Sequence, residues 1–149
     1  MEFNAEVKNA TDSIYQKISG TIPEIEWLIH APYIYKINKL KKEKNAVILA
    51  HNYQTPEIYH GISDFSADSL ALAVEAAKTK ADIIVMCGVH FMAETAKLMS
   101  PEKKVLLPDM NAGCSLSASI TGEDVRNLKK KYPGAVSYTH LTLPTIYSV

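Results

Sequence analysis

The chain has 149 residues, of which 47% are hydrophobic, and its 16 Lys and Arg balance its 16 Asp and Glu. Balanced charge gives no attraction to nucleic acid or to an acidic membrane surface, and this hydrophobic content is too high for a disordered chain. The longest apolar runs, such as Ala46–Ala50, are far too short to cross a bilayer, and the acidic segment Met1–Glu6 does not resemble a secretory signal. We therefore expect a cytoplasmic protein whose two cysteines, Cys87 and Cys114, are free thiols.

Residues 1–44 are predicted to form a helical extension of the main domain. A first amphipathic stretch ends at Gly20, and a second helix is predicted to begin near Pro23, a residue that the first turn of a helix tolerates. Pro32 is predicted to interrupt this second helix. A further helix follows and ends in the lysine-rich segment 39–44, where positive charge suits a helix C-terminus.

From Asn45 onward, short apolar runs alternate with stretches of helical periodicity. The runs, which are typical of parallel strands buried on both faces, are Ala46–Ala50, Ile83–Met86 and Val105–Leu107. Helices are predicted between and after them, at Asp68–Lys80, at His90–Met99 and from Thr121 to the lysines before Pro133. This order predicts an α/β fold over residues 45–135, a parallel three-layer α/β/α sandwich with right-handed crossovers.

The apolar positions of the two central helices predict which faces they bury. At helical spacing, the first helix has Leu70, Ala73, Val74 and Ala77, and the second has Met92, Ala96 and Met99. Ser66 or Asp68 is expected to cap the first helix, and the charged positions of the second, from His90 to Lys97, are expected on a solvated face.

Ligands of parallel α/β sheets bind beyond the carboxyl ends of the strands. The predicted ends carry polar or reactive residues at His51–Tyr53, Cys87–His90 and Pro108–Cys114. Neither a glycine-rich dinucleotide fingerprint nor a P-loop follows the first strand, so the two commonest nucleotide-binding patterns are not present there. The sequence thus predicts a site at this edge of the sheet.

Several residues near these ends have both a functional and a purely structural interpretation. His51 could act as an acid, a base or a donor to an anionic substrate, or it could cap a loop. Tyr53 could be a second donor or an ordinary half-buried tyrosine. Ser69, at a predicted helix N-terminus, could bind a carboxylate or phosphate, or only satisfy the helix end. Cys114, in a loop of small residues, could be a thiolate ligand or an inert cysteine, whereas Cys87 ends an apolar strand and is expected to be structural.

Four collinear stretches resemble the N-terminal part of quinolinate synthases. They are NAVILAHNYQTPEI at Asn45–Ile58, DFSADSLALA at Asp64–Ala73, ADIIVMCGVHFMAETAKLMSPEKKVLLPD at Ala81–Asp109 and AGCSLSASI at Ala112–Ile120. The resemblance covers roughly residues 35–135, and AHNYQ together with GVHFMAETAK is its most specific part.

The resemblance implies three similar α/β domains around one active site, of which this chain would supply the first. Members of this family condense iminoaspartate with dihydroxyacetone phosphate to form quinolinate, with loss of phosphate and water, on the route to NAD. They use a [4Fe-4S] cluster, held by one cysteine from each domain, as a Lewis acid on substrate. The resemblance also implies functional coupling to L-aspartate oxidase or aspartate dehydrogenase, and no nucleic-acid or membrane partner.

Position by position, the resemblance implies a role for each candidate. Cys114 matches the first cluster ligand, and His51 matches a histidine that contacts the substrate and is implicated in catalysis. Ser69 matches a serine that binds a substrate carboxylate, and Tyr53 matches a tyrosine implicated in catalytic proton chemistry. Cys87 matches no ligand position.

Two departures from the family pattern concern the end of the sequence. The family's chain is about twice as long, and its second and third cluster cysteines lie beyond the matching part. The segment Val136–Val149, VSYTHLTLPTIYSV, matches nothing expected there and is interpreted as a non-family tail from a truncated or frameshifted gene model. The 149 residues alone are therefore expected to have little or no activity.

Two functions of other kinds remain as alternatives. One is a small metal-dependent hydrolase that uses His51 and His90 as ligands. The other is a non-catalytic α/β module that binds a small dicarboxylate. Neither of them explains the collinear resemblance.

Overall fold

The structure of the protein is a computed structural model that describes residues 2–136. The chain divides into two compact units, the first ending at Cys114 and the second beginning at Ser115. Apart from residue 136, the predicted non-family tail lies outside the described residues. Within the described part of the chain, no helix combines the length and the apolar character that a membrane crossing requires.

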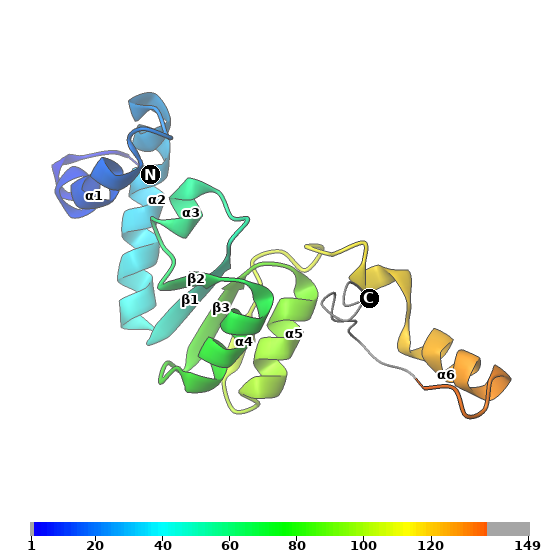
Figure 1. The fold of residues 1–149 in the computed structure, drawn as a ribbon. Helices are drawn as coiled ribbons and strands as arrows, with labels where there is room; N and C mark the ends of the chain where they lie inside the picture. The colour runs from blue at the N-terminus through cyan, green and yellow to red at the C-terminus, as the bar shows by residue number, and fades with distance from the viewer. Residues whose placement is uncertain (1, 137–149) are drawn as a thin grey trace, which may run out of the picture. The chain divides into compact units, whose positions relative to one another are not determined.

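A parallel four-stranded sheet forms the centre of the first unit (Figure 1). Its strands, in the order β2-β1-β3-β4, are β1 (Ala46–His51), β2 (Phe65–Ala67), β3 (Ile83–Cys87) and β4 (Lys104–Leu106). The three apolar runs predicted as strands form β1, β3 and β4, each shifted by no more than one residue at either end. The sequence does not predict β2, because this strand is only three residues long and has the polar Ser66 at its centre.

Helices cover both faces of the sheet, so the unit is the predicted three-layer α/β/α sandwich. The outer layers are α4 (Ser69–Lys78) and α5 (His90–Met99) on one face, and α2 (Glu24–Glu43) with the short α3 (Pro56–Tyr59) on the other. Successive residues of a strand point to opposite faces. In β1, Leu49 accordingly packs in the cluster formed with α4 and α5, and Ile48 packs in the cluster that Ile37 of α2 and Ile58 of α3 adjoin.

The N-terminal extension is a helical hairpin with a core of its own. α1 (Ala5–Ile18) packs against α2, and the ring of Trp27 stacks on Tyr15 with 5.2 Å between centroids. The predicted break at Pro32 is wrong, because α2 runs unbroken over 20 residues with Pro32 inside it. A proline in a helix interior costs roughly 3 kcal/mol. Pro32 is itself buried, and the packing of this side of α2 outweighs the lost hydrogen bond.

The buried face of α4 agrees with the predicted one only at Ala73. Its buried side chains are Leu72, Ala73 and Ala76. The predicted core positions that are instead exposed are Leu70, Val74 and Ala77 of α4 and Met99 of α5. Apolar residues occur on every side of SLALAVEAAK, so their spacing fits more than one face. Contact with α5 selects among these faces, and the buried Ser100 hydroxyl, just beyond α5, donates to Ala76 O of α4 at 2.7 Å.

Asp64 connects α2 to the sheet through an ion pair and a hydrogen bond. The Lys41 ammonium of α2 lies 2.8 Å from Asp64 Oδ1 and donates to Ile62 O, also at 2.8 Å. The second carboxylate oxygen of Asp64 accepts from Ile48 N in β1 at 2.8 Å. One side chain therefore connects the helical extension to the central strand.

The second unit contains a short 3₁₀ turn at Ser117–Ser119 and helix α6 (Gly122–Lys131). Thr121 and Asp124 form a capping box at the start of α6, and the hydrogen bonds from Thr121 lower the pKa of Asp124. The predicted helix, with acids in its first turn and lysines in its last, is confirmed.

Replacing Leu72 by alanine is expected to lower the free energy of unfolding by about 2–5 kcal/mol, because this side chain is fully buried in the core. The matched change Leu70→Ala should alter it by less than about 0.5 kcal/mol, since Leu70 is 75% exposed. Urea denaturation followed by circular dichroism measures both values. Equal losses at the two positions would contradict this orientation of α4.

Candidate functional site

The carboxyl ends of β1, β2 and β3 lie level with one another at one edge of the sheet. His51 at the end of β1 pairs with Ala67 at the end of β2, and Ala50 pairs with Cys87 at the end of β3. Asn52 N donates to Ala67 O at 3.1 Å, which continues the ladder one residue beyond β1. The segments that follow these strands therefore leave the sheet at the same edge, where ligands of such sheets bind.

The rings of His51 and Tyr53 lie against each other, with centroids 4.1 Å apart and planes inclined at 33°. Tyr53 N donates to His51 Nδ1 at 3.4 Å, a long hydrogen bond in which Nδ1 is the acceptor. In a neutral imidazole, an accepting Nδ1 leaves the proton on Nε2, from which it can be donated to a ligand. Tyr53 is 54% exposed and His51 is partly buried, so solvent and small ligands reach both rings.

Gly88 lies beside Met92 and the Tyr53 hydroxyl at the end of β3. A Cβ placed on Gly88 would lie 3.6 Å from the Tyr53 hydroxyl oxygen and 2.8 Å from the sulfur of Met92. The tyrosine thus extends from the end of β1 to the end of β3. Gly88 is not among the predicted site residues, although a glycine directly after a buried strand is a known signal for the close approach of another group.

Cys114 follows β4 in a loop that is tied to the start of α5. His90 N donates to Ala112 O at 2.8 Å, and Cys114 itself is a free, partly buried thiol. The pKa of Tyr53 is raised, first by partial burial of the phenol and second by the negative charge of Cys114. The structure therefore brings the Tyr53 hydroxyl and the Cys114 thiolate within electrostatic reach of each other.

Cys87 lies in the core and not at the site. It is 7% exposed, and burial raises the pKa of its thiol. Metals bind the thiolate form, which a buried thiol with a raised pKa provides poorly. The burial of Cys87 agrees with the structural role predicted for it.

Ser69 is the first residue of α4, at the end of β2 that pairs with His51. Of the two predicted caps, Ser66 and Asp68, the structure has Asp68, whose carboxylate accepts from Ala71 N at 2.9 Å. Within residues 2–136 the Ser69 hydroxyl has no hydrogen-bond partner, and its side chain is partly buried. Asp68 thus pairs with one backbone amide of the helix end and leaves the Ser69 hydroxyl free for another partner.

The residues proposed for a hydrolytic metal site are not assembled into one. His90 Nε2 lies 3.8 Å from Glu94 Oε1 on the exposed side of α5. Across residues 2–136, no group of three or more His, Cys, Asp or Glu side chains is placed to hold a metal ion. Cys114 is thus a single candidate ligand, without a partner ligand set among the described residues.

Comparison with known proteins gives a consistent result over most of the chain. The family model "Quinolinate synthetase A protein" matches residues 35–142. The quinolinate synthase of Sinorhizobium medicae WSM419 is 57% identical over 141 residues, which are 95% of this chain and 39% of that protein. The quinolinate synthase of Caulobacter vibrioides NA1000 is 56% identical over 142 residues, and that of Xylella fastidiosa 9a5c is 62% identical over 108 residues.

The Caulobacter match covers 94% of this chain and 39% of that protein, and the Xylella match covers 72% and 32%. The chain thus spans about two fifths or less of the length of these curated relatives. The matched region contains the whole sheet and all four predicted site residues. The chain belongs to the quinolinate synthetase A family.

Proposed function

We propose that this chain supplies the first domain of a quinolinate synthase, and that the complete enzyme condenses iminoaspartate with dihydroxyacetone phosphate to form quinolinate. The placement of Tyr53 supports this most directly. Its ring lies against His51, its hydroxyl extends over Gly88, and its pKa responds to the charge of Cys114. The residues with proposed roles in substrate contact and cluster binding thus share one edge of the sheet.

Ser69 would bind a carboxylate of iminoaspartate. At the first position of α4 it lies beside unpaired backbone amides and the positive end of the helix dipole, both of which favour an anion. Its hydroxyl adds a donor that Asp68 does not occupy. His51, with a proton on Nε2, would donate to a substrate oxygen on the neighbouring strand end.

Tyr53 would donate a proton during the reaction. A raised pKa means that its hydroxyl stays protonated in the folded protein and is available as a donor at neutral pH. Its ring lies against that of His51, and its hydroxyl lies near Gly88, which places this donor at the edge of the sheet where β1 and β3 end.

Cys114 would provide one thiolate ligand of a [4Fe-4S] cluster. The backbone beside it is open, since a Cβ on Gly113 would contact nothing closer than Asn111 O at 3.7 Å, and small neighbours of this kind allow another group to approach the chain. When bound, the cluster would act as a Lewis acid that polarises a substrate oxygen. The other two cysteine ligands would come from the rest of the enzyme.

The proposed reaction also places the enzyme in metabolism. It lies on the route to NAD, and its imine substrate would come from the oxidation of aspartate by L-aspartate oxidase or aspartate dehydrogenase. We propose the cytoplasm as the compartment, where thiols such as Cys114 remain reduced.

A chimaera tests the proposed function. Residues 1–135 replace the matching part of the Sinorhizobium medicae protein, and the product is reconstituted anaerobically with iron and sulfide. We expect quinolinate formation from the two substrates, a loss of at least about 100-fold with His51→Ala, and loss of bound iron with Cys114→Ser. Cys87→Ala serves as the control thiol and should keep both. A chimaera that binds its iron and forms no quinolinate would contradict the proposed function.

The 149 residues alone should neither bind a stoichiometric cluster nor form quinolinate, because a single thiolate does not hold a cubane cluster. Anaerobic reconstitution followed by iron, sulfide and quinolinate assays measures this, with the complete Sinorhizobium protein treated in parallel. Turnover by the 149-residue chain would show that the site needs no further domain.

Replacing Cys114 by serine is expected to lower the pKa of Tyr53, because the thiolate charge is one of the two causes that raise it. Partial burial should keep the value above that of a free tyrosine. Carbon-13 NMR of labelled tyrosine measures it, with Tyr53→Phe to assign the signal and Cys87→Ser as the control. An unchanged Tyr53 titration would contradict the proximity of the two groups.

The same shift predicts a pH dependence of stability. Folded Tyr53 keeps its proton at a pH where an unfolded tyrosine loses it. Its contribution to stability is therefore present below about pH 10 and declines as the pH rises above that value.

A further inference from the structure

The outer face of α2 carries large apolar side chains that nothing covers in the described part of the chain. These side chains, here called the outer stripe, are Ile25, Leu28, Ile29 and Tyr33, with exposed fractions between 40% and 74%. Their spacing of three to four residues puts them on one side of the helix. The opposite side, which includes Trp27, packs into the core of the hairpin.

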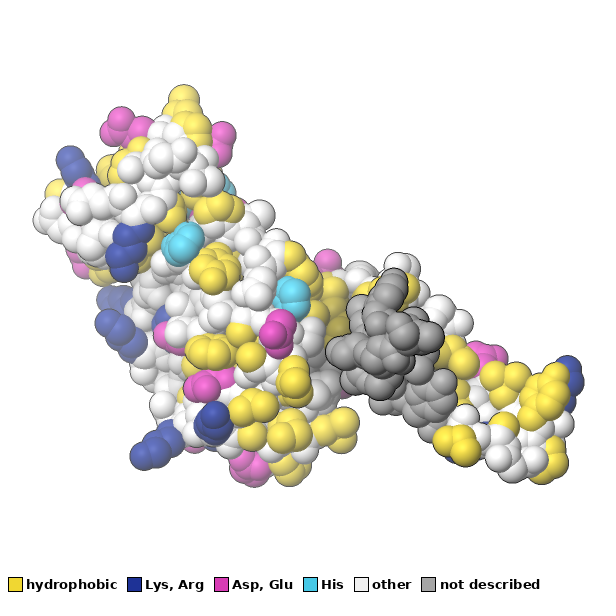
Figure 2. Space-filling model, viewed as in Figure 1, with side chains coloured by type: hydrophobic (Ala, Val, Ile, Leu, Met, Phe, Trp, Pro, Cys, Tyr) yellow, Lys and Arg dark blue, Asp and Glu magenta, His cyan; other side chains and the backbone are white. Residues whose placement is uncertain are grey.

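A helix that is apolar on two faces is normally buried on both. The outer stripe precedes residue 35, where the family match begins, so it lies outside the part of the chain that the family model describes. In Figure 2, hydrophobic and acidic side chains lie together at the end of the hairpin where α2 begins. Contiguous exposed apolar side chains with a polar border are typical of a protein–protein contact.

The charges along α2 indicate which partner fits. The first turn is acidic, with Glu24 and Glu26, whereas exposed cations such as Lys36 follow the stripe. In an antiparallel pair of such helices, Glu26 of each chain would lie beside Lys36 of the other, which gives two pairs of opposite charge. A parallel copy would set like charges side by side, and antiparallel helix dipoles also attract.

We propose that the outer stripe is a homodimer interface, in which two copies of α2 pack antiparallel about a two-fold axis between Ile29 and Tyr33. Such an axis makes the contact self-complementary, with Ile29 of each copy facing Tyr33 of the other. We expect a Kd on the order of micromolar, which is typical of weak, transient contacts between proteins.

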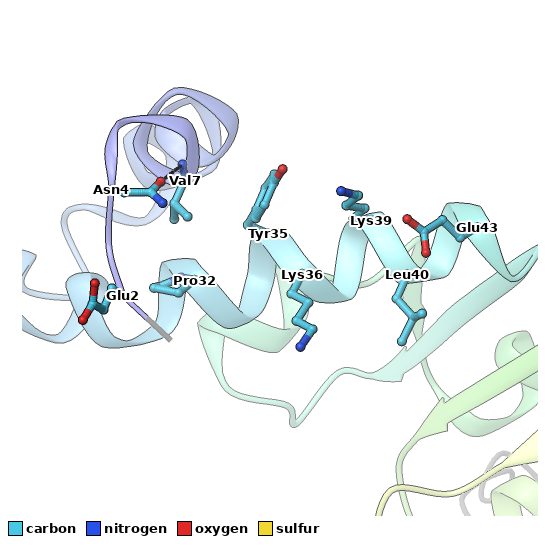
Figure 3. Close-up of a pocket in the computed structure, with 9 residues that line it drawn as sticks. All are labelled: Glu2, Asn4, Val7, Pro32, Tyr35, Lys36, Lys39, Leu40 and Glu43. Carbon is cyan, nitrogen blue, oxygen red and sulfur yellow. Dashed lines mark hydrogen bonds between the residues drawn. The ribbon is translucent and has the colours of Figure 1, made fainter.

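A groove on α2 adjoins the stripe on the side of Lys36. It has a volume of about 570 Å³ and is lined by α2 and by the segment that leads into α1. In Figure 3, Lys36 and Leu40 project from α2 on the side away from Val7 of α1. Lys36, which lines this groove, would meet the carboxylate of Glu26 of the second copy.

Sedimentation equilibrium of the 149-residue chain over a concentration series tests the proposal. We expect a monomer–dimer equilibrium that Ile29→Glu weakens by at least about tenfold in Kd. The control is Leu98→Glu on α5, because Leu98 is also exposed, at 80%, and lies outside the stripe. Circular dichroism melting confirms that both variants fold. A monomer at every concentration, or a dimer equally sensitive to both changes, would overturn the proposal and leave the stripe to another part of a longer polypeptide.

Charge exchange tests the antiparallel register. Lys36→Glu alone and Glu26→Lys alone should each weaken the dimer, since each creates two like-charge contacts. The double variant restores opposite charges across the two-fold axis and should return Kd to near the original value. A double variant as weak as the single ones would exclude this register.

Discussion

The ladder between β1 and its two parallel neighbours is the interaction on which the rest of the structure depends. Both faces of β1 are apolar and buried, so alternation of polar and apolar residues cannot set its register. Polar contacts at each end of β1 set its register instead. Asp64 accepts from Ile48 N on the entry side, and Asn52 N donates to Ala67 O on the exit side. A slip of one residue would break both contacts and move His51 out of line with Ser69.

Small residues, alanine and glycine, help to position the site because they let neighbouring elements approach closely. Alanines at the contact of α4 and α5 let these helices approach closely over one face of the sheet. On the other face, a Cβ on Gly61 would lie 2.1 Å from Glu57 O of α3 and 2.9 Å from Ile34 Cδ1 of α2, so glycine lets the chain pass closely between these helices. At the end of β3, a Cβ on Gly88 would lie 2.8 Å from the sulfur of Met92. Larger residues at these points would displace the elements that place the reactive groups.

Much of this arrangement follows from local sequence. Continuous apolar runs predict β1 and β3 because strands buried on both faces contain little else. The rule for strand ends then places His51, Tyr53 and Cys114 at one edge, and the structure brings the latter two together. Their chemical roles stay proposals, carried by the family resemblance and by this geometry.

What local sequence does not predict depends on contacts between distant segments. β2 is a strand only because it pairs with β1, and Pro32 stays helical only because the hairpin buries it. Leu70 and Leu72 look alike in sequence, and contact with α5 decides which of them is buried.

The parallel topology also dictates an order of assembly. Leu49 pairs with Phe65 and Ala46 with Ile83, so no two neighbouring strands of the sheet can form as a local hairpin. The helices α1 and α2, by contrast, are adjacent in sequence and need no long loop to close. The hairpin can therefore form before the partners of β1 have been synthesised. The ion pair between Lys41 of α2 and Asp64, which lies 23 residues later, then joins the hairpin to the sheet.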